Sequence, residues 1–388
     1  MRQYGMDKFA SIDALVAQHI GVSFPAAQIV VRQHGAIVYA KAFGQIDLDQ
    51  AAQPVHRTNL DTRFDLASVS KLFTVTAFMT LVEAGHVAVD QPVCEVLPAF
   101  RGMRPIAPQQ DPLGSGKLMD TQFGHDQQVD ASQITFRHLL THTSGLPAWL
   151  PIWWMAHPAR LNLVRPYLHA FVLNSSFAYL TGTQIVYSDV GLIALGFAIE
   201  QITGQALDAV VRERVTAPLR LNSVVYGPID ENVAPTEFYA HQGKRMCGEA
   251  HDENAWALQG VAGHAGLFAT AHDVAAFGQS FLLTPSSPHL LTASTISEMT
   301  HPHATDGDTQ RGLGFALWSP DAQASSNPLG HTSFGHTGFT GTSLWVDPKR
   351  ELVVTALTNR VYCGRDKGEG IVPFRVALHQ KAIEELGD

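Results

Sequence analysis

The stretch from Phe64 to His86 constrains the chain most, because it combines a helical pattern with two reactive side chains. After Ser68, apolar residues recur at spacings of three and four, which predicts an amphipathic helix that begins at Ser68 and is capped by Gly85. Ser68 and Lys71 would then lie on the same face of the helix, within contact of each other. Unpaired backbone N–H groups at a helix N-terminus could also stabilise an oxyanion. The stretch predicts a nucleophile, although S-x-x-K also arises by chance at ordinary helix N-caps.

Composition indicates a globular protein of ordinary make-up. Of its 388 residues, 45% are hydrophobic and 16% charged, and the formal net charge is −9. An acidic balance without clustered Lys and Arg argues against nucleic acid or an anionic membrane as a partner. The 3 cysteines are too few and too scattered for a disulfide framework or a zinc site. Neither a signal peptide nor a membrane-length apolar run is found, so the predicted location is the cytoplasm.

Alternating apolar and polar residues near both ends of the chain predict one antiparallel sheet. Two strands flank an expected hairpin turn at His34–Gly35. Further strands are expected in the sequences that begin at Gly312, Ser333 and Glu351. Helices over 7–19 and 372–386 would cover a sheet of about five strands. The expected fold class is therefore α+β.

The middle of the chain is predicted to be a mostly helical insertion in this sheet. Residues 1–66 and 270–388 would form the sheet domain and residues 67–269 the helical domain, with the active site between them. Residues 101–132 are rich in Pro, Gly, Gln and Asp, and they are expected to form a long loop. Such a loop is either a lid or binding loop, or a disordered insertion. The GSGK sequence at Gly114 lacks the spacing of a phosphate-binding loop, and no cofactor is expected.

Three short sequences, SVSK at 68–71, YSD at 187–189 and HTG at 336–338, occur in the order and spacing of the active-site motifs of one superfamily. Around them, the segments FDLASVSKLFT, FRHLLTHTSGLP, YSDVGLIALG and FGHTGFTGTSLWVDP closely resemble penicillin-binding proteins and serine β-lactamases. The resemblance is to the branch of D-alanyl-D-alanine carboxypeptidases, class C β-lactamases and family VIII esterases, and it covers most of the chain. Residues 249–268 also resemble cell-wall amidases and penicillin-binding protein 4B-like hydrolases. The resemblance implies a β-lactamase/transpeptidase-like fold.

The same resemblance implies catalytic roles. Ser68 would be the nucleophile and Tyr187 the base, with Lys71 lowering the pKa of Tyr187 or sharing its proton. The backbone N–H groups of Ser68 and Phe339 would form the oxyanion hole. The third-motif strand would align the substrate, and Gly338 would permit its close approach. The residues expected to bind the substrate or its oxyanion are Asp189, His336, Thr337, Gly338 and Phe339.

Two positions depart from the β-lactamase pattern. Asp189 stands where those enzymes commonly have Asn, so that an acceptor-only carboxylate replaces an amide donor. Hydrolysis of β-lactams is therefore not expected to be the main activity. His336 replaces lysine, as in some D-Ala carboxypeptidases and amidases. Because histidine titrates near pH 6.5, its hold on a substrate carboxylate is expected to weaken as the pH rises through that region.

The leading hypothesis is a serine hydrolase that forms an acyl-enzyme on an amide or ester bond, with a peptidoglycan-derived peptide or muropeptide as substrate. A promiscuous carboxylesterase or a β-lactamase is the closest alternative, and a non-catalytic penicillin-binding sensor is a more distant one. A metal hydrolase finds support only in the spacing of His138 and His142, which favours packing or helix capping. No metal site is expected, and the oligomeric state is left open.

Overall fold

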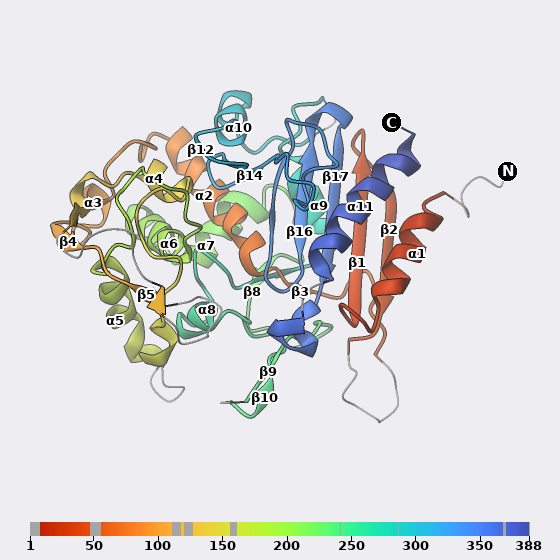
Figure 1. Cartoon of the computed structure of the whole chain (residues 1–388), viewed down its shortest axis with the longest axis horizontal. Helices are drawn as coiled ribbons and strands as arrows, with labels where there is room; N and C mark the ends of the chain where they lie inside the picture. The colour runs from red at the N-terminus through yellow and green to blue at the C-terminus, as the bar shows by residue number, and fades with distance from the viewer. Residues whose placement is uncertain are drawn as a thin grey trace.

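The strand order shows how the chain builds its larger sheet. The computed structural model describes residues 8–46, 56–110, 118–119, 127–155, 161–240, 242–285, 287–367 and 370–387. Within these ranges, eight strands form one antiparallel sheet (Figure 1). In order across the sheet they are β12 (Ala304–Asp306), β13 (Thr309–Arg311), β14 (Ala316–Leu317), β15 (Phe334–Thr337), β16 (Ser343–Asp347), β17 (Leu352–Thr358), β1 (Ala26–Gln33) and β2 (Ala36–Gly44).

The two ends of the chain meet where β1 pairs with β17, for example at Val30 and Thr355. The predicted hairpin between β1 and β2 is confirmed. His34 and Gly35 both have positive φ, 51° and 80°, which is the conformation that a tight two-residue hairpin turn requires. The first and last parts of the sequence therefore share one sheet.

The sheet has three more strands than the predicted five. The segment that begins at Ser333 forms two strands, β15 and β16, and β12 and β13 were not predicted. β12 and β13 have only three residues each and no large apolar side chain, so neither shows an alternation of apolar and polar side chains. They extend the sheet beyond β14, and β14 itself pairs with β15, the strand that carries the third motif. The expected fold class is otherwise confirmed.

Helices cover both faces of the sheet, because β1 is apolar on both sides. Ile29 and Val31 pack with α1 (Ala10–His19) and α11 (Ile371–Leu386) on one face. Val30 belongs to the core on the other face, which α9 (Ala271–Gln279) covers (Figure 1). The predicted terminal helices are thus present, although residues 1–7 lie outside the described part of the chain.

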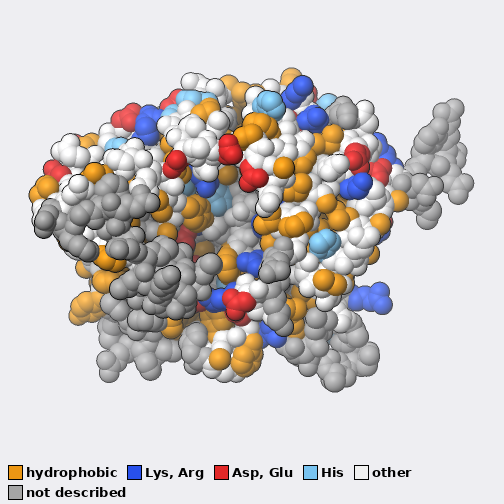
Figure 2. Space-filling view, viewed as in Figure 1, with side chains coloured by type: hydrophobic (Ala, Val, Ile, Leu, Met, Phe, Trp, Pro, Cys, Tyr) orange, Lys and Arg blue, Asp and Glu red, His pale blue; other side chains and the backbone are white. Residues whose placement is uncertain are grey.

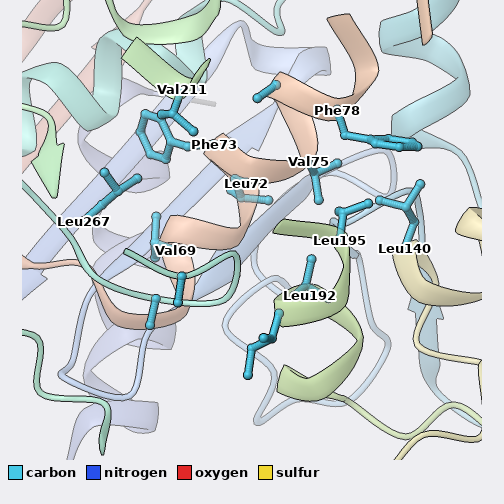
Figure 3. Close-up of a cluster of buried hydrophobic side chains, with 14 of the residues drawn as sticks. Val69, Leu72, Phe73, Val75, Phe78, Leu140, Leu192, Leu195, Val211 and Leu267 are labelled. Carbon is cyan, nitrogen blue, oxygen red and sulfur yellow. The ribbon is translucent and has the colours of Figure 1, made fainter. Parts of the chain in front are cut away.

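The remaining helices form the other side of the molecule. They are α2 (Ser70–Glu83), α3 (Val93–Val96), α4 (Phe136–Leu140), α5 (Leu161–Leu173), α6 (Asp189–Thr203), α7 (Leu207–Val211), α8 (Glu253–Ala257) and α10 (Ala293–Thr300). Side chains from α2, α4, α6, α7 and β11 (Leu267–Ala269) converge in one apolar cluster (Figure 3). The predicted amphipathic character of α2 is wrong, because its side chains are buried on nearly all sides.

The segment 101–132 contains short ladders where it is described. β4 (Met103–Pro105) pairs with β7 (Gln128–Asp130), and β5 (Gln109–Gln110) pairs with β6 (Leu118–Met119). The rest of the predicted loop, residues 111–117 and 120–126, lies outside the described residues. A structureless loop over the whole segment is therefore wrong.

Among the described helices, no single one is both long and apolar enough to cross a membrane. The pair Asp189–Thr203 and Leu207–Thr216, bent by 81°, has the necessary length and composition only when the two are taken together. Both members of this pair contribute side chains to the apolar core.

Candidate active site

A pocket of about 980 Å³ brings the three sequence motifs together. Its lining includes Ser68 from the first motif, Tyr187 and Asp189 from the second, and His336 from the third. Charged and histidine side chains gather around a hollow near the middle of the face shown in Figure 2. The described residues of the segment 101–132 do not line this pocket.

Ser68 lies in a short 3-10 turn, Ala67–Val69, and α2 begins two residues later, at Ser70. The preceding residue, Ala67, has a left-handed φ of 45°, which is strained for a residue with a side chain. The buried carboxylate of Asp65 holds this conformation by accepting a hydrogen bond from the N–H of Ala67 at 2.7 Å. The prediction that the helix begins at Ser68 is wrong by two residues, because a short 3-10 turn precedes the helix.

The predicted contact between Ser68 and Lys71 is present, since the turn continues directly into the helix. Lys71 is 1% exposed, and its Nζ donates to the Oγ of Ser68 at 2.8 Å and to the carbonyl of His264 at 2.9 Å. The same Nζ lies 2.7 Å from Oδ1 of Asp189. Burial lowers the pKa of Lys71, but Asp189 and Tyr187 raise it by more, so the net pKa lies above the ordinary value. Lys71 is therefore an ammonium group with three acceptors.

Tyr187 stands just before α6, whose N-cap is Ser188. Its ring centroid lies 4.9 Å from the Nζ of Lys71. Burial raises the pKa of Tyr187, and the opposing charge of Lys71 does not cancel this effect. The expectation that Lys71 lowers this pKa is right for the contribution of Lys71 and wrong for the net result. Tyr187 is a neutral phenol at neutral pH.

His142 supports Tyr187, a role that sequence reasoning missed. Its Nδ1 accepts a hydrogen bond from the N–H of Ser188 at 3.1 Å, and its ring packs against Tyr187 at 4.7 Å. The resemblance segment FRHLLTHTSGLP contains His142, which was the available signal. The neighbouring His138 caps α4 by accepting from the N–H of Thr135, so the capping interpretation is confirmed there.

His336 is buried in the pocket wall, with 4% of its surface exposed. Its Nδ1 donates to the carbonyl of Thr337 at 2.7 Å. Burial lowers the pKa of His336 to about 3, and the positive charges of Lys71 and Arg311 act in the same direction. The expected titration near pH 6.5 is therefore wrong. A neutral imidazole cannot hold a substrate carboxylate by charge.

Gly338 was expected to permit close approach of the substrate, but in the structure it permits close approach of other parts of the protein. A Cβ at this position would lie 2.1 Å from Oγ1 of Thr342 and 2.5 Å from the carbonyl of Leu66. The glycine therefore lets the third motif pack against the segment before Ser68. Phe339 follows it, and its N–H has no hydrogen-bond partner among the described residues. This free N–H is compatible with the oxyanion role inferred from the resemblance, and Thr337 also lines the pocket.

A turn rich in glycine places His264 beside Lys71. Gly263 passes so close to α6 that a Cβ would lie 2.0 Å from the carbonyl of Leu192, which explains the closely spaced glycines of the sequence. Nε2 of His264 donates to Oδ1 of Asp252 at 2.7 Å. Despite burial, this histidine holds the pKa of Asp252 well below its usual range. The turn thus supplies a carbonyl to Lys71 and a histidine that is hydrogen-bonded to Asp252.

Three groups in this region have the chemistry of metal ligands. Ligand atoms of Asp189, Asp252 and His264 lie within 4.8 Å of one another. Each already contacts a protein group, because Asp189 pairs with Lys71 and Asp252 with His264. The arrangement reads as an ionic network around Lys71.

Arg311 is a further pocket residue that sequence reasoning missed, since it lies on the unpredicted strand β13. Its Cζ lies 5.7 Å from the ring centroid of Tyr187, and it is partly buried. Within the described residues, no carboxylate pairs with it. The nearby Arg365, by contrast, pairs with Glu237 and Glu253 at 2.9 and 2.6 Å. Arg360 and Arg375 also line the pocket without a carboxylate partner, but their guanidinium groups donate to backbone carbonyls. Among the described residues, Arg311 has neither a carboxylate nor a carbonyl partner, so it presents an uncompensated guanidinium to the pocket.

The fold and this site define a serine hydrolase of the β-lactamase/transpeptidase-like type. The chain belongs to the Beta-lactamase family, whose model matches residues 12–371.

Relatives and solved structures agree with this assignment. The chain is 30% identical to an N-acetylmuramyl-L-alanine amidase of Bacillus subtilis, over 92% of this chain and 82% of the relative. It is 26% identical to a putative D-alanyl-D-alanine carboxypeptidase of Escherichia coli, over 92% and 83%. A penicillin-binding protein homologue from Caulobacter crescentus has the same fold, with a TM-score of 0.70, 20% identity and 98% of both chains covered.

Proposed function

We propose that this protein hydrolyses an amide bond in a short peptide that carries a free carboxylate, through an acyl-enzyme on Ser68. A peptidoglycan-derived peptide or muropeptide is the proposed natural substrate. The observation that carries the proposal is the unpaired guanidinium of Arg311, in the same pocket as Ser68. The names of the Bacillus and Escherichia relatives, an amidase and a putative carboxypeptidase, support the same substrate class. A cytoplasmic location stays a prediction.

An unpaired charge in a partly buried site is costly, and an incoming anion would remove that cost. A guanidinium suits a carboxylate, because its fork of N–H groups can donate two parallel hydrogen bonds. Arg311 lies against Tyr187, which in turn lies against Lys71, so a carboxylate bound there would lie close to the nucleophile. His336, being neutral, would contribute hydrogen bonding and packing without charge.

The roles proposed for the remaining residues follow from their positions. Ser68 is the nucleophile, Lys71 donates a hydrogen bond to its hydroxyl, and Tyr187 packs against Lys71. The N–H groups of Ser68 and Phe339 would stabilise the oxyanion, each contributing on the order of 10²–10³ in rate. Asp189 of α6 and Thr337 of β15 also line the pocket.

The test compares two substrates that differ only in charge, an N-acylated D-Ala-D-Ala or muramyl-L-Ala peptide as the free acid and as its C-terminal amide. We expect the wild type to prefer the acid, and Arg311→Gln to lower kcat/KM for the acid roughly 10–100-fold, the usual worth of a charged hydrogen bond. Turnover of nitrophenyl acetate, which has no carboxylate, should stay within a factor of about 2 in the variant. Ser68→Ala should abolish all three reactions.

Other outcomes would favour the alternatives. Equal turnover of acid and amide, with fast cleavage of short nitrophenyl esters, would indicate a carboxylesterase. Faster consumption of a penicillin than of either peptide would indicate a β-lactamase, and a stable penicillin adduct without turnover would indicate a sensor. Activity that is lost with a chelator and survives Ser68→Ala would indicate a metal hydrolase.

A further inference from the structure

The ammonium of Lys71 has no lone pair, and three acceptors surround its N–H groups. Its Nζ contacts the Oγ of Ser68, the carbonyl of His264 and the carboxylate of Asp189 at 2.7–2.9 Å. An ammonium that donates to Ser68 cannot also remove the proton of Ser68. Lys71 must therefore lose a proton before it can act as the base.

Tyr187 does not supply the missing base in the resting site. Its hydroxyl is buried and neutral, because burial outweighs the positive charge of Lys71. The carboxyl groups close to Lys71 are those of Asp189 and Asp252. Asp252 is occupied by His264 and by the N–H of Ala255, whereas Asp189 contacts Lys71 directly.

We propose that Asp189 is the proton acceptor that turns Lys71 into a base, so that Ser68, Lys71 and Asp189 form a proton relay. This inference rests on the proposed function, because it names the groups that take the proton of Ser68 in the proposed reaction. Asp189 acts through Lys71 and is a positioning residue in this reaction. The carboxylate at the third position of the YSD motif, which sets the chain apart from the Asn of β-lactamases, is what makes the relay possible.

The relay balances in protons and electrons. As the Oγ of Ser68 attacks the carbonyl carbon, the proton on Oγ passes to the Nζ of Lys71 while another passes from Nζ to Oδ1 of Asp189. The new Oγ–C bond forms and the carbonyl π pair moves to oxygen. When the intermediate collapses, the C–N or C–O bond breaks and the leaving group takes a proton from Lys71, which recovers one from Asp189. In deacylation, water attacks the acyl carbon and passes its proton to Lys71, which passes one to Asp189. The bond to Oγ then breaks, and Oγ takes a proton back from Lys71, which recovers one from Asp189.

The charged surroundings come from several elements. Asp252, at the N-cap of α8, adds negative charge near Lys71. Its carboxylate is hydrogen-bonded to His264. His142 and His336 face the site from the segment after α4 and from β15, and both have pKa values lowered by burial, so they are neutral at neutral pH. Arg311 faces Tyr187 from β13.

The test follows the pH dependence of nitrophenyl acetate hydrolysis in Asp189→Asn, whose amide oxygen can still accept from Lys71 but cannot take a proton. At pH 7 we expect kcat to fall on the order of 10²-fold or more with little change in KM, the range for loss of a general base. The rate of the variant should rise with pH above neutrality as Lys71 deprotonates, with a slope that the wild type lacks. Asp189→Glu should restore activity at pH 7 without that slope.

Controls separate this inference from the proposed function. Asp252→Asn removes the other carboxylate near Lys71 and must not reproduce the slope, and circular dichroism checks that every variant is folded. If the wild type turns over the ester through Ser68 and the profile of Asp189→Asn matches it, the relay is overturned while the proposed function stands. A wild type without Ser68-dependent turnover would overturn both.

Discussion

His336 illustrates, at the scale of single residues, how burial changes the chemistry of a side chain. Its type predicts a switch near pH 6.5, but the pocket wall excludes water from the ring, and Lys71 and Arg311 oppose its protonation. The same burial leaves Tyr187 neutral, while an ion pair with Asp189 keeps Lys71 charged. The charge of each group depends on its neighbours.

A first prediction concerns stability in acid. The folded pKa of His336 is about 3 and its unfolded value is about 6.5, so the unfolded state binds the proton first as the pH falls. Stability from this residue is complete above pH 6.5 and declines between pH 6.5 and 3. At pH 5 the loss is about 2 kcal/mol relative to pH 7.

His336→Asn keeps an N–H donor for the carbonyl of Thr337 but cannot titrate. Urea unfolding at pH 7 and pH 5 should show a loss of stability smaller by about 2 kcal/mol in this variant than in the wild type. His86→Asn, at an exposed position, is the matched control. An equal acid loss in wild type and His336→Asn would contradict a neutral, buried His336.

At the scale of elements, the turn over residues 260–266 couples packing to the site. Gly263 lets the turn lie against α6, and His264 then presents its carbonyl to Lys71. The α6 helix carries Asp189 at its first position, so one packing contact places two of the acceptors of Lys71. The group that Gly263 approaches is decided by how the turn packs on α6.

A second prediction is that Gly263→Ala destabilises the protein by about 3 kcal/mol, because the added Cβ would overlap the carbonyl of Leu192. Turnover should fall as well, since His264 would move away from Lys71. Gly85→Ala is the control, because its Cβ would meet no atom within 4 Å and its positive φ alone costs roughly 1 kcal/mol. Thermal unfolding and ester hydrolysis measure both effects, and equal small losses would contradict the close packing.

At the scale of the whole molecule, one apolar core joins the sheet to the helices. It runs from Val30 on β1 through Phe277 on α9 to Phe73 on α2, whose ring stacks on Phe277 at 4.0 Å. The division into a domain of residues 1–66 and 270–388 and another of residues 67–269 remains a prediction. A continuous core favours unfolding of both parts together.

A third prediction follows, that urea unfolds the protein in one transition. Tryptophans lie in both parts, for example Trp153 and Trp256 in the helical region and Trp345 in β16. Tryptophan emission and far-ultraviolet circular dichroism should therefore give coincident midpoints. Two separated transitions would show that the predicted domains unfold independently.

The sequence predicted those parts of the fold that depend on local pattern. The hairpin at His34–Gly35 and the helices near both ends of the chain are present, because turns depend on a few adjacent residues and helices on a local apolar period. The strands β12 and β13 were missed because three residues without a large apolar side chain carry no periodic signal. The burial of α2 was misjudged because helices pack over it from several sides.

By itself, the sequence determined the contact between Ser68 and Lys71, because residues three apart meet wherever the chain turns helically. It also determined the family, through the order of its three motifs. Only the tertiary structure decided the charges in the site. The pairing of Lys71 with Asp189, the neutral state of His336 and the unpaired Arg311 depend on groups far apart in the chain and on how much water the packed pocket excludes.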